Sequence, residues 1–306
     1  MRSIAAATLA VAALTGASWQ QTLRVNVDAV RVDVLVMDGN RPVGGLTGAD
    51  FELRDSGVVQ RVDSVAFEDV PLSIMLALDA SASVRGQPLD NLKEAASALV
   101  ALMQPADRAA LLTFSEEIDL RADWTADAKQ LERAIAGTQA SGSTALYDAA
   151  YAALTLKDPA AGRPLVLMFS DGEDTASWLP GRTALDAARR SEAVVYVVGL
   201  RAAAMAWPGY LVDFRSGPQP AIPNVMPSAL SASFLAALAE DTGGKYLEAG
   251  RSERLGEAFT QIVAEFRSRY LLTYTPRGVD AGGWHPIDVR TKNRKGTITA
   301  RRGYLR

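Results

Sequence analysis

The chain changes its hydrophobic rhythm near residue 70. Between residues 23 and 67, apolar residues fall near alternate positions, which is typical of strands with one buried face. The valines that set this alternation are Val25, Val27, Val30, Val32, Val34 and Val36. Turn signals rich in Gly, Asp and Asn interrupt it at 38–40, 44–45 and 55–57. We therefore predict an N-terminal β module over residues 21–69, with three or four strands.

Residues 70–266 alternate between buried strands and helices. The strands predicted by short apolar runs are 72–78, 109–114, 118–124, 165–169, 194–200 and 245–247. The helices predicted by helical spacing are about 89–103, 131–135, 144–156, 183–190, 234–239 and 252–266. The second and third strands are close enough in sequence to form a hairpin. Such alternation implies right-handed crossovers and a mostly parallel, doubly wound α/β sheet of the Rossmann-like kind.

The last part of the chain, residues 267–306, returns to alternation. Strands are predicted at 270–274, 287–290 and 298–304, and we expect them to pair with the N-terminal strands in a small sandwich-like module. Before them, residues 203–228 are rich in proline and glycine. A functional loop and a disordered segment are both consistent with that composition. Its aromatic residues Trp207, Tyr210 and Phe214 either anchor this segment to the domain, the interpretation we favour, or border a binding site and shape its specificity.

The first residues have the pattern of an export signal. Met1 and Arg2 precede an uncharged apolar run over residues 4–13, and small residues follow at 16–18. The apolar run is shorter than the roughly 20 residues that a membrane span needs. We therefore predict a signal peptide at residues 1–20 and an exported protein, whether periplasmic, cell-surface or secreted, whose mature chain has no membrane span. A retained N-terminal anchor is the alternative.

Composition excludes several classes of site. The 306 residues suffice for one α/β domain and a smaller module. The absence of cysteine excludes disulfides, thiolate metal sites and cysteine nucleophiles. The single histidine, His285, is interpreted as a surface or packing residue, and one histidine leaves little scope for a histidine zinc site or a Ser-His-Asp triad.

The net charge of -3 gives no reason to expect nucleic acid as a partner. Basic residues gather near the C-terminus, where they alternate with apolar ones. We interpret them as a solvated strand face. They are Arg290, Lys292, Arg294, Lys295, Arg301 and Arg302.

Three polar motifs follow buried strands or precede a helix. They are Asp79-Ala80-Ser81-Ala82-Ser83, Ser141-Gly142-Ser143-Thr144 and Ser170-Asp171-Gly172. In an open parallel sheet, loops at the carboxyl ends of the strands line a common crevice. Their carboxylates and hydroxyls suit a hard cation, magnesium first, with calcium or manganese also possible. Because hydroxyl ligands are neutral, such an ion keeps affinity for one more anionic oxygen, from water or from the carboxylate of another protein.

Together the three motifs resemble the metal-ion-dependent adhesion site (MIDAS) of von Willebrand factor A (VWA) domains. The resemblance covers roughly residues 70–266, and residues 43–51 and 301–304 resemble bacterial exported VWA-related proteins. It implies a binding or cell-adhesion protein that is not an enzyme and that holds a protein partner through a divalent cation. The implied metal ligands are the hydroxyls of Ser81, Ser83 and Thr144, with Asp79 and Asp171 acting directly or through water.

Each motif also has a purely structural interpretation. Ser81, Ser83 and Thr144 stand where helix N-caps are common, and Asp171 beside a glycine is a usual turn residue. Neighbouring acidic residues raise the same question. Glu173 and Asp174 either raise the cation affinity or are solvated loop carboxylates, the interpretation we favour. Asp148 either supports the site or faces solvent.

Three other functions stay open at this stage. A magnesium-dependent, phosphatase-like hydrolase would use Asp79 as nucleophile, but it needs a second carboxylate where this chain has Ser81. A structural metal is possible, with partners bound through the β module instead. A carbohydrate or matrix ligand in place of a protein is also compatible with the sequence. The chain has no P-loop motif.

Overall fold

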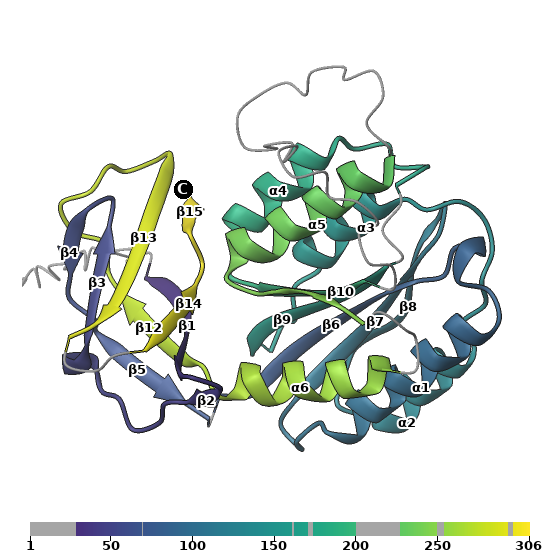
Figure 1. Cartoon of the computed structure of the whole chain (residues 1–306), viewed down its shortest axis with the longest axis horizontal. Coiled ribbons are helices and arrows are strands. Elements are labelled where there is room, and N and C mark those ends of the chain that lie inside the picture. The colour runs from purple at the N-terminus through teal and green to yellow at the C-terminus, as the bar shows by residue number, and fades with distance from the viewer. Residues whose placement is uncertain are drawn as a thin grey trace, which may run out of the picture.

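The computed structural model places an α/β unit beside a β module (Figure 1). It describes residues 29–68, 70–160, 162–170, 174–199, 227–249, 254–292 and 296–306. The predicted signal peptide and almost all of the proline-rich segment 203–228 lie outside these residues. No helix in the described part of the chain is both long and apolar enough to span a membrane.

A six-stranded sheet forms the centre of the α/β unit, in the order β11-β10-β9-β6-β7-β8. Its strands are β6 (Leu72–Asp79), β7 (Arg108–Phe114), β8 (Ile118–Thr125), β9 (Arg163–Ser170), β10 (Val194–Gly199) and β11 (Tyr246–Glu248). Neighbouring strands run parallel except β7 and β8, which form the predicted hairpin. Strand β6 is buried along its whole length, because helices cover both faces of the sheet.

Two hydrophobic cores lie on the two faces of this sheet. Helices α1 (Gln87–Ala101), α2 (Ala128–Ala136) and α6 (Leu255–Arg267) pack on one face, and α3 (Leu146–Thr155), α4 (Gly181–Arg190) and α5 (Pro227–Thr242) pack on the other (Figure 1). A short 3-10 turn, η2 (Ala82–Val84), follows β6. The predicted doubly wound α/β class is therefore confirmed.

Strands from both ends of the sequence build the β module. They are β1 (Val30–Asp38), β2 (Arg41–Pro42), β3 (Phe51–Asp55), β4 (Val58–Gln60), β5 (Ser64–Phe67), β12 (Tyr270–Tyr274), β13 (Trp284–Thr291), β14 (Thr297–Ala300) and β15 (Gly303–Leu305), with a 3-10 turn η1 (Gly48–Asp50). One sheet has the order β14-β1-β12-β5, with β2 beside β1, and the other has the order β15-β13-β3-β4. A shared core lies between the sheets, so the sandwich-like pairing of the two ends is confirmed. The single strand predicted at 298–304 is two strands, because the chain passes from one sheet to the other between them.

A buried carboxylate joins the two sheets of the module. Asp55 on β3 is fully buried, and its Oδ2 accepts hydrogen bonds from the hydroxyls of Tyr274 (2.8 Å) and Tyr304 (2.9 Å). His285 Nδ1 lies 3.0 Å from its Oδ1. Tyr274 belongs to the opposite sheet, so the carboxylate links both layers. His285 is 1% exposed and is thus a packing residue, one of the two alternatives predicted for it.

The module contacts the amino ends of the parallel strands. Asp33 on β1 forms a buried ion pair with Arg163 at the start of β9, and Arg31 pairs at 3.3 Å with Glu192, just before β10. Because β9 advances about 3.3 Å per residue, its opposite end lies about 23 Å away. The carboxyl edge of the sheet, which carries the polar motifs, is therefore distant from the module.

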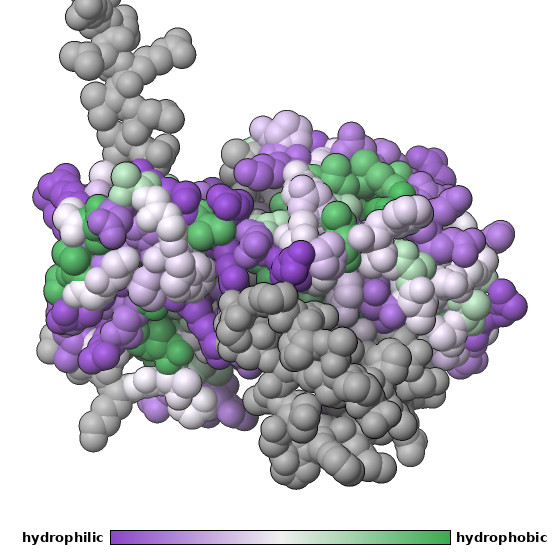
Figure 2. Space-filling model, turned by 90° about the horizontal axis from the view of Figure 1, so that it is seen from above, coloured by the Kyte–Doolittle hydropathy of each residue, from purple (hydrophilic) through white to green (hydrophobic). Residues whose placement is uncertain are grey.

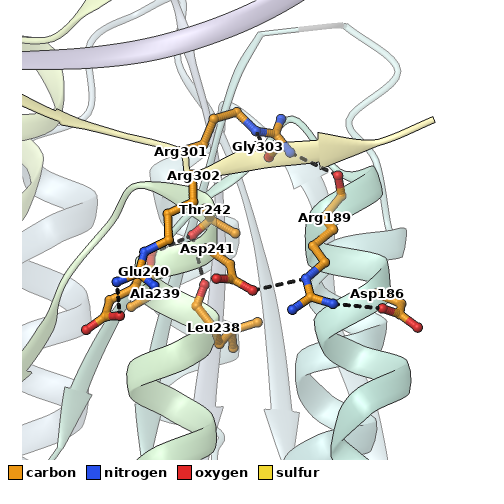
Figure 3. Close-up of polar contacts among 10 residues, drawn as sticks. All are labelled: Asp186, Arg189, Leu238, Ala239, Glu240, Asp241, Thr242, Arg301, Arg302 and Gly303. Carbon is orange, nitrogen blue, oxygen red and sulfur yellow. Dashed lines mark hydrogen bonds and ion pairs between the residues drawn. The ribbon is translucent and has the colours of Figure 1, made fainter. Parts of the chain in front are cut away.

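A second contact joins the C-terminal segment to helices α4 and α5. Hydrophilic residues gather along the boundary between the two units (Figure 2). Within it, Arg301 donates to the carbonyl of Arg189 at 3.0 Å, and Arg302 pairs with Glu240 at 2.6 Å (Figure 3). Arg189 also pairs with Asp241 at 3.1 Å. The predicted solvated face is wrong for Arg301, which is 7% exposed, because this strand end docks on another unit.

Replacing Asp55 with asparagine should destabilise the module. The variant removes the charged acceptor of two tyrosine hydroxyls in a buried site, and we expect the free energy of unfolding in urea to fall by about 3 kcal/mol. Asp288→Asn is the matched control, since this carboxylate is exposed on β13 and pairs with Arg290 on the surface. It should change stability by less than about 0.5 kcal/mol. Equal losses in the two variants would contradict the role given to Asp55.

Stability should also fall in alkali. Burial, and then the hydrogen bond to Asp55, raises the pKa of Tyr304 to about 12, and the same causes raise the pKa of Tyr274. The unfolded chain loses tyrosine protons near pH 10, so the folded state holds more protons above that pH. The free energy of unfolding should therefore decline from pH 10 to 12. Urea titrations at several pH values would measure the slope. Tyr304→Phe should make it shallower, and an unchanged slope would refute this assignment.

Candidate metal centre

The last residue of β6, Asp79, is a carboxylate with no exposed surface. The apolar run before it is buried on both faces, which places Asp79 at the carboxyl edge of the sheet. Its Oδ1 accepts a hydrogen bond from the Ser81 amide, and its Oδ2 accepts one from the Ser170 hydroxyl, both at 2.9 Å. Ser170 ends the neighbouring parallel strand β9. The carboxylate is therefore fixed by its own loop and by the next strand.

Two hydroxyls lie together directly after this carboxylate. Ser81 Oγ and Ser83 Oγ are 2.9 Å apart, with Ser81 buried and Ser83 exposed. Ser81 occupies the N-cap position of η2, but its hydroxyl contacts Ser83 rather than capping the turn. Helix α1 begins later, with Gly86 at its N-cap position. The capping alternative therefore does not account for these serines.

The second motif lies beside the first. The Ser141 amide donates to the Ala80 carbonyl at 2.8 Å, and the Ala82 amide donates to the Gly142 carbonyl at 3.0 Å. Gly142 has a φ of 74°, in the left-handed region, and a Cβ there would meet the side chain of Glu116 at 2.9 Å. A glycine suits this turn. The backbone thus brings the Ser141–Thr144 loop against the Asp79–Ser83 loop.

The third loop is bonded to Thr144. The amide of Thr144 donates to Thr175 Oγ1 at 2.9 Å, and its carbonyl accepts from the Thr175 amide at 2.8 Å. Helix α3 has Ala145 at its N-cap position, so the N-cap interpretation of Thr144 is wrong. Thr144 is 4% exposed. The loop after β9 is therefore attached to the loop before α3.

Four of the five predicted metal ligands lie in the described residues. Asp79, Ser81 and Ser83 are in one loop, and Thr144 is in the loop hydrogen-bonded to it. The fifth, Asp171, lies outside the described residues, together with Gly172 and Glu173.

Two neighbouring carboxylates hold the third loop in place. Asp174 is half-buried, and its Oδ1 accepts a hydrogen bond from the Leu146 amide at 2.9 Å in the first turn of α3. Burial raises the pKa of Asp174 above its usual range. The prediction of a solvated carboxylate is therefore wrong, because free amides at a helix start attract such a group. Asp148 accepts from the amides of Trp178 and Leu179, each at 2.9 Å.

All five candidate ligands would bind a metal through oxygen atoms. In the described part of the chain, no three His, Asp or Glu side chains gather as a metal cluster, and the described candidate ligands are one carboxylate and three hydroxyls. Adjacent oxygens around Mg²⁺, at 2.0–2.1 Å in octahedral geometry, are about 2.9 Å apart. The Ser81 and Ser83 hydroxyls form a hydrogen bond of 2.9 Å, a separation that is compatible with two neighbouring ligands of such an ion. These residues fit a hard cation.

Residues outside the predicted motifs also contribute to these loops, and the sequence did not single them out. Trp178, in the loop between β9 and α4, is 93% exposed. Its only sequence signal is an aromatic residue shortly after the Ser-Asp-Gly motif. Exposure of a loop side chain cannot be read from hydrophobic periodicity, because irregular segments have no period.

Known proteins share this fold. The family model of the von Willebrand factor type A domain matches residues 74–173. A von Willebrand factor type A structure from Catenulispora acidiphila is 13% identical, with a TM-score of 0.51, and the match covers 89% of this chain and 76% of that one. No curated protein sequence matches the chain.

Two further solved structures are similar. Proximal thread matrix protein 1 from the mussel byssus, with a zinc-occupied MIDAS motif, is 14% identical at a TM-score of 0.50, covering 68% of this chain and 48% of that one. An aerotolerance-related membrane protein from Bacteroides fragilis is 20% identical at a TM-score of 0.48, covering 63% and 99%. At such identities the likeness concerns the fold. The α/β unit of this chain has the fold of a von Willebrand factor type A domain, and residues 74–173 carry the sequence match to that family.

Proposed function

We propose that the carboxyl edge of the sheet holds a divalent cation, and that this cation binds a carboxylate of a protein partner. The ligands would be Asp79, Ser81, Ser83, Thr144 and Asp171, with Mg²⁺ as the first choice of metal. The observation that carries the proposal is the pair of serine hydroxyls, hydrogen-bonded to each other at 2.9 Å, directly after a buried carboxylate. Their contact serves no helix cap.

The charges of this ligand set favour binding a further anion. Hydroxyls contribute no charge, and hard cations take carboxylates, hydroxyls and water readily. Ser83 is exposed, so at least this proposed ligand is open to solvent. A partner's aspartate or glutamate could replace water there and form a direct bond to the ion.

The mussel protein supports the metal but leaves its identity open. Its MIDAS motif is described with zinc. An all-oxygen set without thiol or imidazole suits magnesium, calcium or manganese better than zinc, which prefers nitrogen and sulfur ligands. We therefore keep magnesium as the natural metal in this proposal.

Binding is favoured over hydrolysis by the chemistry around Asp79. A phosphatase of the aspartyl type needs a second carboxylate two residues on, where this chain has Ser81. The single histidine lies in the β module, which contacts the opposite end of the sheet. Neither a carboxylate two residues after Asp79 nor an imidazole is therefore present in the described loops. The function we favour is cation-dependent protein binding or adhesion, and export of the chain remains part of the proposal.

Removing one ligand should abolish cation binding. We expect Asp79→Ala to lose Mg²⁺ or Mn²⁺ binding in calorimetric titrations. Ser83→Ala, at an exposed position that the fold tolerates, should weaken binding by about tenfold or more, which is about 1.4 kcal/mol. The matched control is Ser143→Ala, an exposed serine of the neighbouring loop that is not a predicted ligand. A folded Asp79→Ala protein, or a Ser83→Ala protein, that binds the cation as tightly as wild type would refute the site.

Partner binding separates an adhesion site from a structural metal. Immobilised protein should retain a partner from native extract in Mg²⁺ and release it on chelation, and Asp79→Ala should retain none. With a purely structural metal, chelation would lower the melting temperature but leave the partner bound. If the chelated protein and Asp79→Ala both retain the partner, the partner would bind through the β module instead.

A further inference from the structure

The side chain of Trp178 is unusual among the described residues. It is 93% exposed, whereas the next most exposed large hydrophobic residue, Val59, is 57% exposed. Tryptophan has a large apolar surface, and it is usually mostly buried in folded proteins. An almost fully exposed indole, in a loop hydrogen-bonded to the start of α3, is a feature that the fold of the α/β unit does not require.

Hydrogen bonds fix the backbone that presents this indole. The amides of Trp178 and Leu179 donate to the two oxygens of Asp148, each at 2.9 Å. One residue earlier, Ser177 Oγ accepts from the Tyr147 amide at 2.9 Å. The loop is thus held on the first turn of α3. Because this backbone is already ordered, a partner that binds the indole loses little conformational entropy in the loop.

The same loop carries Trp178 close to a predicted metal ligand. Thr175 is joined to Thr144 by two hydrogen bonds, of 2.9 and 2.8 Å. Trp178 follows Thr175 by three residues, and three residues span at most about 11 Å. A strand advances about 3.3 Å per residue. One short extended segment of a partner can therefore reach both the cation and the indole.

We propose that Trp178 is the specificity residue of this site, an inference that rests on the proposed function. It selects protein segments in which a large apolar side chain lies about two to four residues from the aspartate or glutamate that binds the cation. Tryptophan is one of the residue types enriched among the energetic hot spots of interfaces. The apolar side chain packs on the indole while the carboxylate completes the coordination shell.

The surroundings favour a protein partner over a sugar. Sugars stacked on an indole also need nearby side chains that accept hydrogen bonds from their hydroxyls. The two carboxylates that hold this loop, Asp148 and Asp174, already accept hydrogen bonds from backbone amides. An apolar side chain has no hydroxyl groups and therefore needs no such acceptor.

A displayed peptide library provides the test. The library is selected on the full chain in Mg²⁺ and eluted with a chelator. The selected peptides should share an Asp or Glu and a large apolar residue at fixed spacing. A synthetic peptide from this set should bind Trp178→Ala at least about tenfold more weakly than wild type. Replacing its apolar residue with alanine should cause a similar loss on wild type and little further loss on Trp178→Ala.

Two measurements show that the variant affects the indole alone. Trp178→Ala should keep the melting temperature and the Mg²⁺ affinity of wild type, because the side chain is exposed and is not a ligand. Val59→Ala, which removes an exposed apolar side chain from the β module, is the matched control and should bind the peptide normally.

The outcomes distinguish this inference from the function on which it rests. Mg²⁺-dependent acidic peptides that bind Trp178→Ala as tightly as wild type would overturn the role of Trp178 and leave the cation site standing. A selection without any Mg²⁺-dependent acidic peptide would overturn both. Binding of arrayed glycans that Trp178→Ala abolishes, with peptides unaffected, would assign the indole to a sugar. An indole shielded from acrylamide quenching in the free protein, by comparison with Trp178→Phe, would mean that this chain covers it and would also overturn the proposal.

Discussion

The candidate metal centre depends on one buried carboxylate at the end of the central strand. Taking a carboxylate out of water is unfavourable unless hydrogen bonds or an opposite charge compensate it. Asp79 receives hydrogen bonds from the Ser81 amide and the Ser170 hydroxyl, so its charge holds together β6, the loop after it and the end of β9. A bound cation would add compensation at the same point. Metal affinity and the arrangement of these loops would therefore be linked.

Hydrophobic pattern located the elements but could not locate their contacts. The continuous apolar run of 72–78 predicts a strand buried on both faces, and it also predicts where Asp79 lies, because a parallel sheet gathers its carboxyl ends at one edge. Alternation, by contrast, predicts that one face of a strand is buried, but it does not identify the element that packs against that face. Arg301 therefore had the pattern of a solvated face although its guanidinium contacts the end of α4. The network around Asp55 and His285 joins strands more than 200 residues apart, which no local pattern reports.

For the candidate metal centre, too, some features could be predicted from the sequence and others could not. The spacing of serines and aspartates at strand ends is visible in the sequence, so Ser81 and Ser83 could be proposed as ligands from the sequence alone. The competing N-cap interpretation was settled by where helices begin, which varies by a turn and depends on the surrounding loops. Asp174 and Trp178 were not predictable, because one is buried and the other exposed through tertiary contacts of an irregular loop.

The α/β unit enters and leaves the β module through neighbouring strands. Phe67 at the end of β5 lies opposite Tyr270 at the start of β12, and neighbouring strands are about 4.8 Å apart. The whole unit is therefore an insertion whose two connections start side by side. A tight turn could join β5 to β12 directly and keep every strand pair of the sandwich. The strand pairing of the sandwich therefore does not depend on which domain is inserted between β5 and β12, and a different domain could be inserted there without changing its register.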